Sequence, residues 1–483
     1  MQIILFICFV VYTLFLFGVM WVTSRKATND TYFTGNRKSP WFVVAYGMIG
    51  ASLSGVTFMS VPGDVKTTQF TYFAIVLGYV LGYLVIAYLL LPLYYRLNLT
   101  SIYQFLGTRF GNTAQKTGSM LFIISRLVGS ALRMYLVIFV LQFFIFDDWG
   151  IPIWLTAVFM IFIIFFYTFK GGLKTVVWTD LFQTTFFLAA LVITIWIIFK
   201  DLNFSLPEAV SVMKSNHYLK IFNTDWHSSQ FYLKQILGGM FITITMTGLD
   251  QDMMQKNLSC KNIKEAQRNM ISFTGILVIV NALFLLLGGL LLIYAQYHAI
   301  DLNGMKTDQI YPYLALNHLG QLAAFFFVIG LMAAGYSSAD GTFTALTTSF
   351  CFDILNIQRF TKDERKQVRI RRWVHLLMSL LFLSVIIIFS NYHNDALIRT
   401  LFKIAGYTYG PILGLFAFGM FTKRTIKKAA TIPIVAMISP TIVYVFAHFA
   451  PKILWGYQFG FELIIVNGAL VFLLLLLLSK KNK

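Results

Sequence analysis

A stripe of polar residues runs along one face of an otherwise apolar segment, residues 325–353. Its members are Ser337, Asp340, Gly341, Thr344 and Thr348. Their helical spacing places them on one side of a helix. A carboxylate at the centre of a membrane helix costs about 2.5–3.5 kcal/mol on insertion scales. The chain must therefore offset the charge of Asp340, and a bound cation, a proton or a basic partner would each do so.

Small and hydroxylated residues interrupt two other apolar segments. The first is 47–57, rich in glycine and serine, and the second is 243–248, which Asp250 and Asp252 follow. Broken helices are tolerated in a membrane only where they are buried in protein or line a wet cavity, although small residues also permit close helix packing. Interrupted spans at matching places in two halves point to an inverted-repeat transporter. For the two aspartates we favour capping of the cytoplasmic half, beside Lys256.

Three charged residues lie within other apolar segments. Arg126 and Arg133 share one face of the expected helix 117–146. Snorkelling to an interface is the alternative for such residues, but their depth in the segment favours a functional or paired role. Asp180, near the start of the segment 174–199, is either an interfacial carboxylate or part of a site.

The elements that must position these residues are membrane helices. Of the 483 residues, 58% are hydrophobic and 12% charged, whereas soluble domains carry about 25% charged residues. Many apolar runs reach about 20 residues, the length that spans a bilayer core. The sequence therefore predicts an all-α polytopic membrane protein. The thirteen expected helices are 2–23, 41–62, 72–95, 117–146, 152–169, 174–199, 231–255, 271–297, 321–355, 370–390, 396–421, 428–449 and 459–478.

The net charge of +19 is a signal of topology. Most of the 38 lysine and arginine residues fall in alternate connections, including the one that contains Lys256. The positive-inside rule then places the N-terminus outside and the C-terminus in the cytoplasm. The bilayer, and not a nucleic acid, is the expected partner. Cys8, Cys260 and Cys351 form no spaced pair, so neither a disulfide framework nor a metal site is indicated.

Short motifs in a fixed order resemble those of the sodium:solute symporter family, which includes sodium–glucose, sodium–proline and sodium–sialic acid transporters. The motifs are Tyr32-Phe33 with Gly35, the run from Ser52 to Phe58, Gly171-Gly172, Val177-Trp178-Thr179-Asp180 with Gln183, Gln251-Asp252, Ser337-Ser338, and Gly410-Pro411 with Phe421-Thr422-Lys423-Arg424. The resemblance implies a LeuT-type fold with a 5+5 inverted repeat. It divides the chain into a first peripheral helix and cytoplasmic loop (1–40), repeat one (41–200), an external loop (201–230), repeat two (231–424) and two peripheral C-terminal helices (425–483).

The resemblance also implies two cation sites. The common sodium site falls on Gly50, Leu53, Ala334, Ser337 and Ser338. Sodium is a hard cation that suits such oxygen ligands. A second site, as in sialic acid transporters, falls on Asp180, Ser337, Asp340 and Gly341. Here Asp340 and Gly341 replace hydroxyls of the family pattern, so Asp340 binds a cation, carries a proton or pairs with Arg126 or Arg133.

The solute site implied by the resemblance departs from the sialic acid pattern. The implied solute-binding residues that match it are Ser52, Ser54, Thr57 and Tyr72. Val76 and Gly129 stand where that branch has a glutamine and an arginine. Arg126 and Arg133 flank Gly129, and either guanidinium would bind a carboxylate through two hydrogen bonds. Sugars, sialic acid-like solutes and other organic anions therefore remain open.

The resulting hypothesis is a sodium-coupled symporter in the plasma membrane, the inner membrane of a bacterium, that imports a small organic solute by alternating access. Sodium is its only expected metal ion. A proton-coupled or facilitative carrier of the same fold is the alternative. A membrane sensor usually has a soluble output domain, and an intramembrane enzyme needs a nucleophile–base or metal constellation. The sequence indicates neither, so no catalytic residue is predicted.

Overall fold

The computed structural model describes residues 2–25, 27–390 and 397–480 and is almost entirely helical. The first residue of the expected helix 396–421 and the last residues of the segment 425–483 lie outside the described residues. The long helices and the parts of broken ones are α1 (Gln2–Thr23), α3 (Trp41–Ser52), α4 (Gly55–Thr68), α5 (Tyr72–Val85), α6 (Leu91–Arg96), α8 (Asn112–Leu141), α9 (Ile153–Gly171), α10 (Leu173–Leu202), α12 (Tyr232–Thr243), α13 (Gln251–Leu258), α14 (Ile263–Tyr297), α16 (Gly320–Ser349), α18 (Glu364–Ser390), α19 (Leu397–Phe421), α20 (Thr431–Ile453) and α21 (Leu463–Leu478).

Shorter elements join or extend these helices. The connecting helices are α2 (Asn29–Thr34), α7 (Gln104–Phe110), α11 (Leu206–Ser215), α15 (Thr307–Asn317) and α17 (Ile357–Phe360). Single 3₁₀ turns are η1 (Gly35–Arg37) and η4 (Asp147–Trp149), and π-helical turns are η2 (Ile86–Leu90), η3 (Gln142–Phe146), η5 (Ile244–Gly248) and η6 (Phe350–Ile354). Two short strands, β1 (Thr425–Ile426) and β2 (Ser479–Lys480), pair antiparallel.

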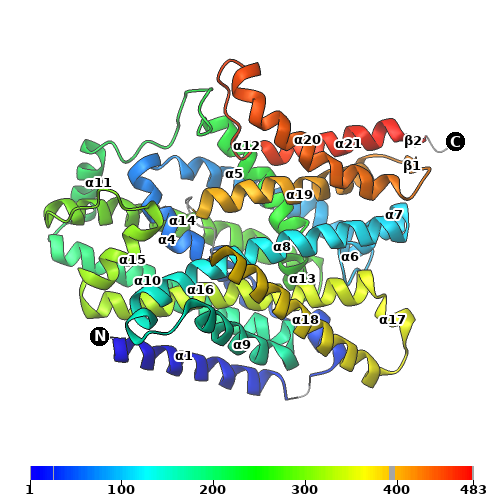
Figure 1. Ribbon diagram of the computed structural model, residues 1–483, viewed down its shortest axis with the longest axis horizontal. Helices are drawn as coiled ribbons and strands as arrows, with labels where there is room; N and C mark the ends of the chain where they lie inside the picture. Colours follow the sequence, from blue (N-terminus) through cyan, green and yellow to red (C-terminus); the bar gives the residue numbers. More distant parts are fainter. Residues whose placement is uncertain (1, 26, 391–396, 481–483) are drawn as a thin grey trace.

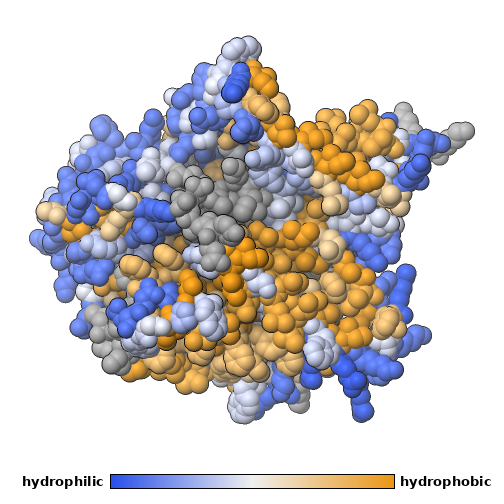
Figure 2. All heavy atoms as spheres, in the orientation of Figure 1, coloured by the Kyte–Doolittle hydropathy of each residue, from blue (hydrophilic) through white to orange (hydrophobic). Residues whose placement is uncertain are grey.

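The molecule has the surface of a membrane protein. Its long helices run mostly along the horizontal axis of Figure 1, with α11 at the left end and α7 and α17 at the right end. Hydrophobic residues fill the middle of the face in Figure 2, and hydrophilic residues gather at both ends. The exposed apolar side chains include Trp21, Phe162 and Trp373. A broad apolar band between two polar ends is the surface that a bilayer requires.

The predicted spans are matched in part. Among the described residues, eight helices are long and apolar enough to cross a membrane, or nine if the bent pair α3 and α4 forms one span. Shorter apolar helices are Phe9–Thr23 and Leu463–Leu478. Helices lie at all thirteen expected positions. Fewer than thirteen of the described helices, however, meet the length and hydropathy expected of a membrane span.

Both predicted interruptions are present. Helix α3 ends at Ser52 and α4 begins at Gly55, and their axes differ by 58°. In the second case α12 runs into η5, and Leu249 and Asp250 then leave the helical conformation before α13 begins. The Asp250 carboxylate accepts a hydrogen bond from the Met253 N–H at 3.2 Å, which confirms its predicted capping role.

Helix α16 is the central helix of the bundle. It packs against α10, α8, α18, α13 and α3, and Ser337, Asp340 and Thr344 of its polar stripe are all buried. Small residues allow this close packing. A Cβ atom at Gly335 would lie 2.9 Å from Val137, and one at Gly341 would overlap the carboxylate of Asp252. The predicted stripe therefore faces protein and not lipid.

Candidate functional site

The break between α3 and α4 leaves backbone oxygens available deep in the protein. The Gly50 N–H donates to Thr184 Oγ1 at 3.0 Å, and the Leu53 N–H donates to the Ile49 carbonyl at 2.8 Å. No described backbone N–H group donates to the carbonyl oxygens of Gly50 or Leu53. A helix end always frees such carbonyls. Here they lie among buried residues, where a cation would satisfy them.

The stretch of α16 that packs on α3 supplies hydroxyl groups. Ser337 donates a hydrogen bond to Asp180 Oδ1 at 2.5 Å. Ser338 Oγ is fully buried and has no hydrogen-bond partner among the described residues. Buried polar atoms without partners are uncommon and need an explanation. An oxygen ligand for an alkali cation is one. Ala334, the remaining predicted member of this site, is also buried on α16.

A lysine lies at the predicted second cation site. Lys256 Nζ is 2.8 Å from Asp180 Oδ2 and 3.6 Å from Asp252 Oδ1, and the three side chains are 1–2% exposed. The sequence predicts Lys256 in a basic connection, and that placement is wrong, because the residue is buried on α13. Two aspartates offset the cost of burying its ammonium group, so this lysine stays inside the bundle.

Asp340 is held by neutral groups. Its Oδ2 accepts hydrogen bonds from Tyr167 at 2.9 Å, Thr179 at 3.3 Å and Gln183 at 3.4 Å. Its Oδ1 accepts one from the Gly341 N–H at 2.6 Å. No ion pair to Asp340 occurs in the described part of the chain, so its predicted pairing with Arg126 or Arg133 is not found. The structure brings Asp180 and Ser337 together. Asp340 bonds to neither of them and accepts its side-chain hydrogen bonds from Tyr167, Thr179 and Gln183.

The two arginines of α8 have different surroundings. Arg126 forms ion pairs with Asp250 at 3.4 Å and with Asp252, and its Nε donates to Thr342 Oγ1 at 3.1 Å. Arg133 forms none of the ion pairs found among the described residues, and its buried Nε has no partner there. The charge of Arg126 is therefore neutralised inside the protein, and the guanidinium of Arg133 is available to a ligand.

An inner cavity of about 70 Å³ lies next to the break between α3 and α4. Its lining includes all six residues predicted to bind solute, which are Ser52, Ser54, Thr57, Tyr72, Arg126 and Arg133. Sequence reasoning missed Tyr79 and Tyr83, which also line it. Their spacing from Tyr72 puts all three rings on one face of a helix, a signal that was present in the sequence.

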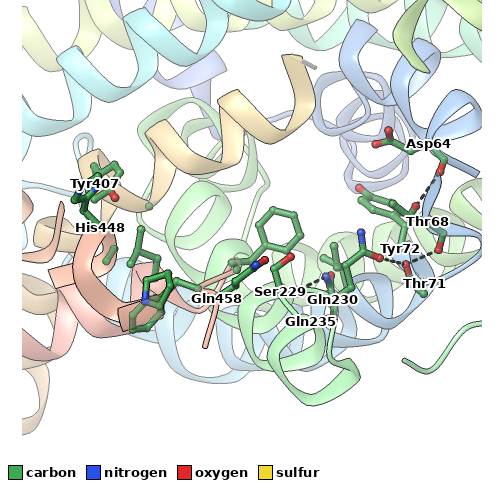
Figure 3. A pocket seen from close by; sticks show the side chains of 18 of the residues that line it. Asp64, Thr68, Thr71, Tyr72, Ser229, Gln230, Gln235, Tyr407, His448 and Gln458 are labelled. Carbon is green, nitrogen blue, oxygen red and sulfur yellow. Dashed lines mark hydrogen bonds between the residues drawn. The ribbon is translucent and has the colours of Figure 1, made fainter. Parts of the chain in front are cut away.

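A larger outer cavity of about 520 Å³ shares one lining residue with the inner cavity. Its polar lining includes Asp64, Thr71, Gln230 and Gln235, together with Tyr407 and His448 (Figure 3). Tyr72 lines both cavities. The Tyr72 and Tyr79 hydroxyls are 3.2 Å apart, within hydrogen-bond distance. Tyr72 therefore stands between a polar vestibule and the inner cavity.

Comparison with known proteins gives consistent matches over most of the chain. The model of the sodium:solute symporter family matches residues 32–437. The sodium/sialic acid symporter SiaT of Proteus mirabilis is 26% identical over 427 residues, covering 87% of this chain and 84% of SiaT. The human sodium/iodide cotransporter is 26% identical over 417 residues, covering 83% of this chain and 63% of the cotransporter.

The fold is also found in a solved structure. A Na⁺-coupled sialic acid symporter, solved in a substrate-bound outward-open state, matches with a TM-score of 0.84, 22% identity and coverage of 99% of both chains. At this identity the match shows the fold alone. The matched proteins are transporters and not enzymes. Among the described residues no group of three or more His, Cys, Asp or Glu could hold a metal ion.

Proposed function

This chain belongs to the sodium:solute symporter family, and from that membership we propose that it couples sodium influx to the import of a small organic anion. The observation that carries the proposal is Ser338, a buried hydroxyl with no hydrogen-bond partner in the described structure, on the helix that packs against α3. With the free carbonyls of Gly50 and Leu53 it supplies neutral oxygen ligands. Such ligands suit a hard alkali cation. Ala334 and Ser337 complete the proposed set.

Sodium binding at this site would be coupled to solute binding through the conformation of the protein. The proposed ligands come from α3 in the first expected repeat and from α16 in the second, so a bound ion holds the two together. Coupling requires only that sodium binds one conformation more tightly than the other. Sodium bound from outside would favour the state in which the solute site is accessible from the vestibule. Opening on the inner side would then release both.

The proposed solute is anionic because Arg133 lines the inner cavity and forms no ion pair with any described residue. A guanidinium recognises a carboxylate with two parallel hydrogen bonds. Ser52, Ser54 and Thr57 offer hydroxyl groups from the broken helix, and Tyr72 covers the cavity on the vestibule side. The relatives named for sialic acid and for iodide also carry anions. A carboxylate smaller than sialic acid fits the small inner cavity.

The finer architecture is part of the same proposal. We infer thirteen spans, with repeats at 41–200 and 231–424 in opposite orientations, flanked by peripheral segments at 1–40 and 425–483 and separated by an external loop at 201–230. The two interrupted helices at corresponding places support this division. The basic connections support an outside N-terminus and a cytoplasmic C-terminus in the plasma membrane, the inner membrane of a bacterial cell.

A proton-coupled carrier of the same fold is the second candidate, and Asp340 is the observation that favours it. This carboxylate is fully buried, and its described hydrogen-bond donors are all uncharged. A carboxyl group in such a place is suited to carry a proton. Uptake that follows a pH gradient in the absence of sodium would select this candidate. Uptake that needs neither gradient would select a facilitative carrier.

The test of sodium coupling is uptake into proteoliposomes. A thermal-shift screen of the purified protein with sugars, sialic acids, amino acids and carboxylates, with and without sodium, first identifies the solute. Radiolabelled uptake is then measured under an inward sodium gradient and with choline in place of sodium. We expect accumulation only with sodium. Uptake that is unaltered by removing sodium would refute the proposal.

Ser338→Ala should raise the sodium concentration for half-maximal uptake about tenfold. The substitution removes one hydroxyl ligand, and a factor of ten corresponds to about 1.4 kcal/mol of lost sodium binding. Sodium titration of uptake measures the change. The matched control is Ser379→Ala on α18, which removes a hydroxyl bonded within its own helix to the His375 carbonyl. Equal sodium dependence in both variants would exclude Ser338 as a ligand.

A further inference from the structure

Lys256 is a buried cation that joins separate helices. It lies on α13, the inner half of the second broken helix, and its ammonium group reaches Asp180 on α10 at 2.8 Å. The side chain is only 1% exposed. A lysine in such a place is held by its ion pairs, since an unpaired buried ammonium group is strongly disfavoured.

Both oxygens of the Asp180 carboxylate have partners. Oδ1 accepts from the Ser337 hydroxyl at 2.5 Å, and Oδ2 faces the Lys256 ammonium. A carboxylate beside a serine hydroxyl is an oxygen set that suits an alkali cation. Here a positive charge that belongs to the chain already occupies that set. A sodium ion at the same carboxylate would meet the ammonium at close range, in a buried region where like charges repel strongly.

The charges around Lys256 support this assignment. Asp252 is shared, because it accepts from Arg126 and also lies 3.6 Å from Lys256 Nζ. Arg126 in turn pairs with Asp250. Three aspartates and two cations therefore form one continuous buried cluster. Removing the charge of Lys256 would leave Asp180 without a cationic partner among the described ion pairs.

We propose that the Lys256 ammonium group takes the place of a second sodium ion at Asp180, so that each chain binds one sodium ion. This inference rests on the proposed sodium coupling and fixes its stoichiometry. A lysine with only a packing role would predict that its loss weakens the fold and leaves the number of bound ions unchanged. If the ammonium group instead replaces a sodium ion, removing Lys256 should create a sodium site at Asp180.

Equilibrium binding of ²²Na⁺ to the purified full chain tests the proposal. We expect one ion per chain at saturation for the natural protein and two for Lys256→Met, which keeps an unbranched side chain of nearly the same length without its charge. Lys256→Arg, which keeps the charge, should bind one. The double variant Lys256→Met with Asp180→Asn should also bind one, since the freed carboxylate is gone.

Stability provides a second readout. In Lys256→Met, replacing choline chloride by sodium chloride should raise the unfolding temperature by more than in the natural protein, because sodium neutralises Asp180. If the methionine variant does not fold, Lys256→Gln, which retains a hydrogen-bond donor, takes its place in both measurements. Two ions on the natural protein, or one on the uncharged variant, would overturn this inference alone. No bound sodium on the natural protein would overturn the proposed function and this inference with it.

Discussion

Arg133→Gln is expected to abolish solute uptake while sodium binding persists. Arg133 lines the inner cavity, and its Nε is buried without a partner among the described residues. Truncating one partner of a buried, hydrogen-bonded charge pair costs about 2–5 kcal/mol. This corresponds to a loss of at least about 30-fold in solute affinity. The proposed sodium ligands lie on α3 and α16, so sodium binding does not require this side chain.

The measurement is uptake of the solute identified by the screen, together with ²²Na⁺ binding to the same preparation. Arg133→Lys should retain part of the activity, because lysine keeps the charge but not the two-pronged geometry of a guanidinium. Lys116→Gln is the matched control, since it removes an exposed cation from the same helix, α8. Full uptake in Arg133→Gln would show that the solute is not held through its negative charge, whatever its coupling ion.

Asp252→Asn is expected to be the most destabilising single substitution in the buried cluster. Asp252 is 2% exposed and pairs with both Arg126 and Lys256. Removing one partner of a buried ion pair typically costs about 3–5 kcal/mol, because it leaves an uncompensated charge inside the protein. Asparagine has nearly the same shape, so the effect isolates the charge from the packing.

Denaturant titration of the purified protein in detergent measures the change in the free energy of unfolding. Asp225→Asn is the control, because the Asp225 side chain lies in a connection and is 61% exposed. We expect a clear loss of stability for Asp252→Asn and almost none for the control. Equal stability of the two variants would mean that the ion pairs of Asp252 contribute little to the fold.

Local sequence patterns identified much of this architecture. Glycine and serine in the middle of an apolar run predicted the break after Ser52, since a helix weakened there must be buried or line a cavity. Helical spacing predicted the stripe on α16, and its residues are buried together with all the others from Phe327 to Ser349. The residues expected around the solute line one cavity. In each case the information lies within a few turns of one helix.

The remaining features depend on contacts between distant segments. Arg126 and Arg133 share a helix face and look alike in the sequence, and only the approach of α13 neutralises the first. Lys256 follows a cytoplasmic basic pattern, yet its partner Asp180 lies on α10. Hydropathy and charge counts do not report such pairings. They placed Lys256 in a basic connection because a charge count does not include the partner of each charge.

The position of Tyr72 between the two cavities offers a route to blockers of this carrier. A molecule large enough to fill the 520 Å³ vestibule, with one arm extending past Tyr72, would occupy both spaces at once. Such a compound would compete with the transported solute for Arg133. It would be too long for the binding site to close around it. It would therefore block the carrier from the vestibule without being carried across.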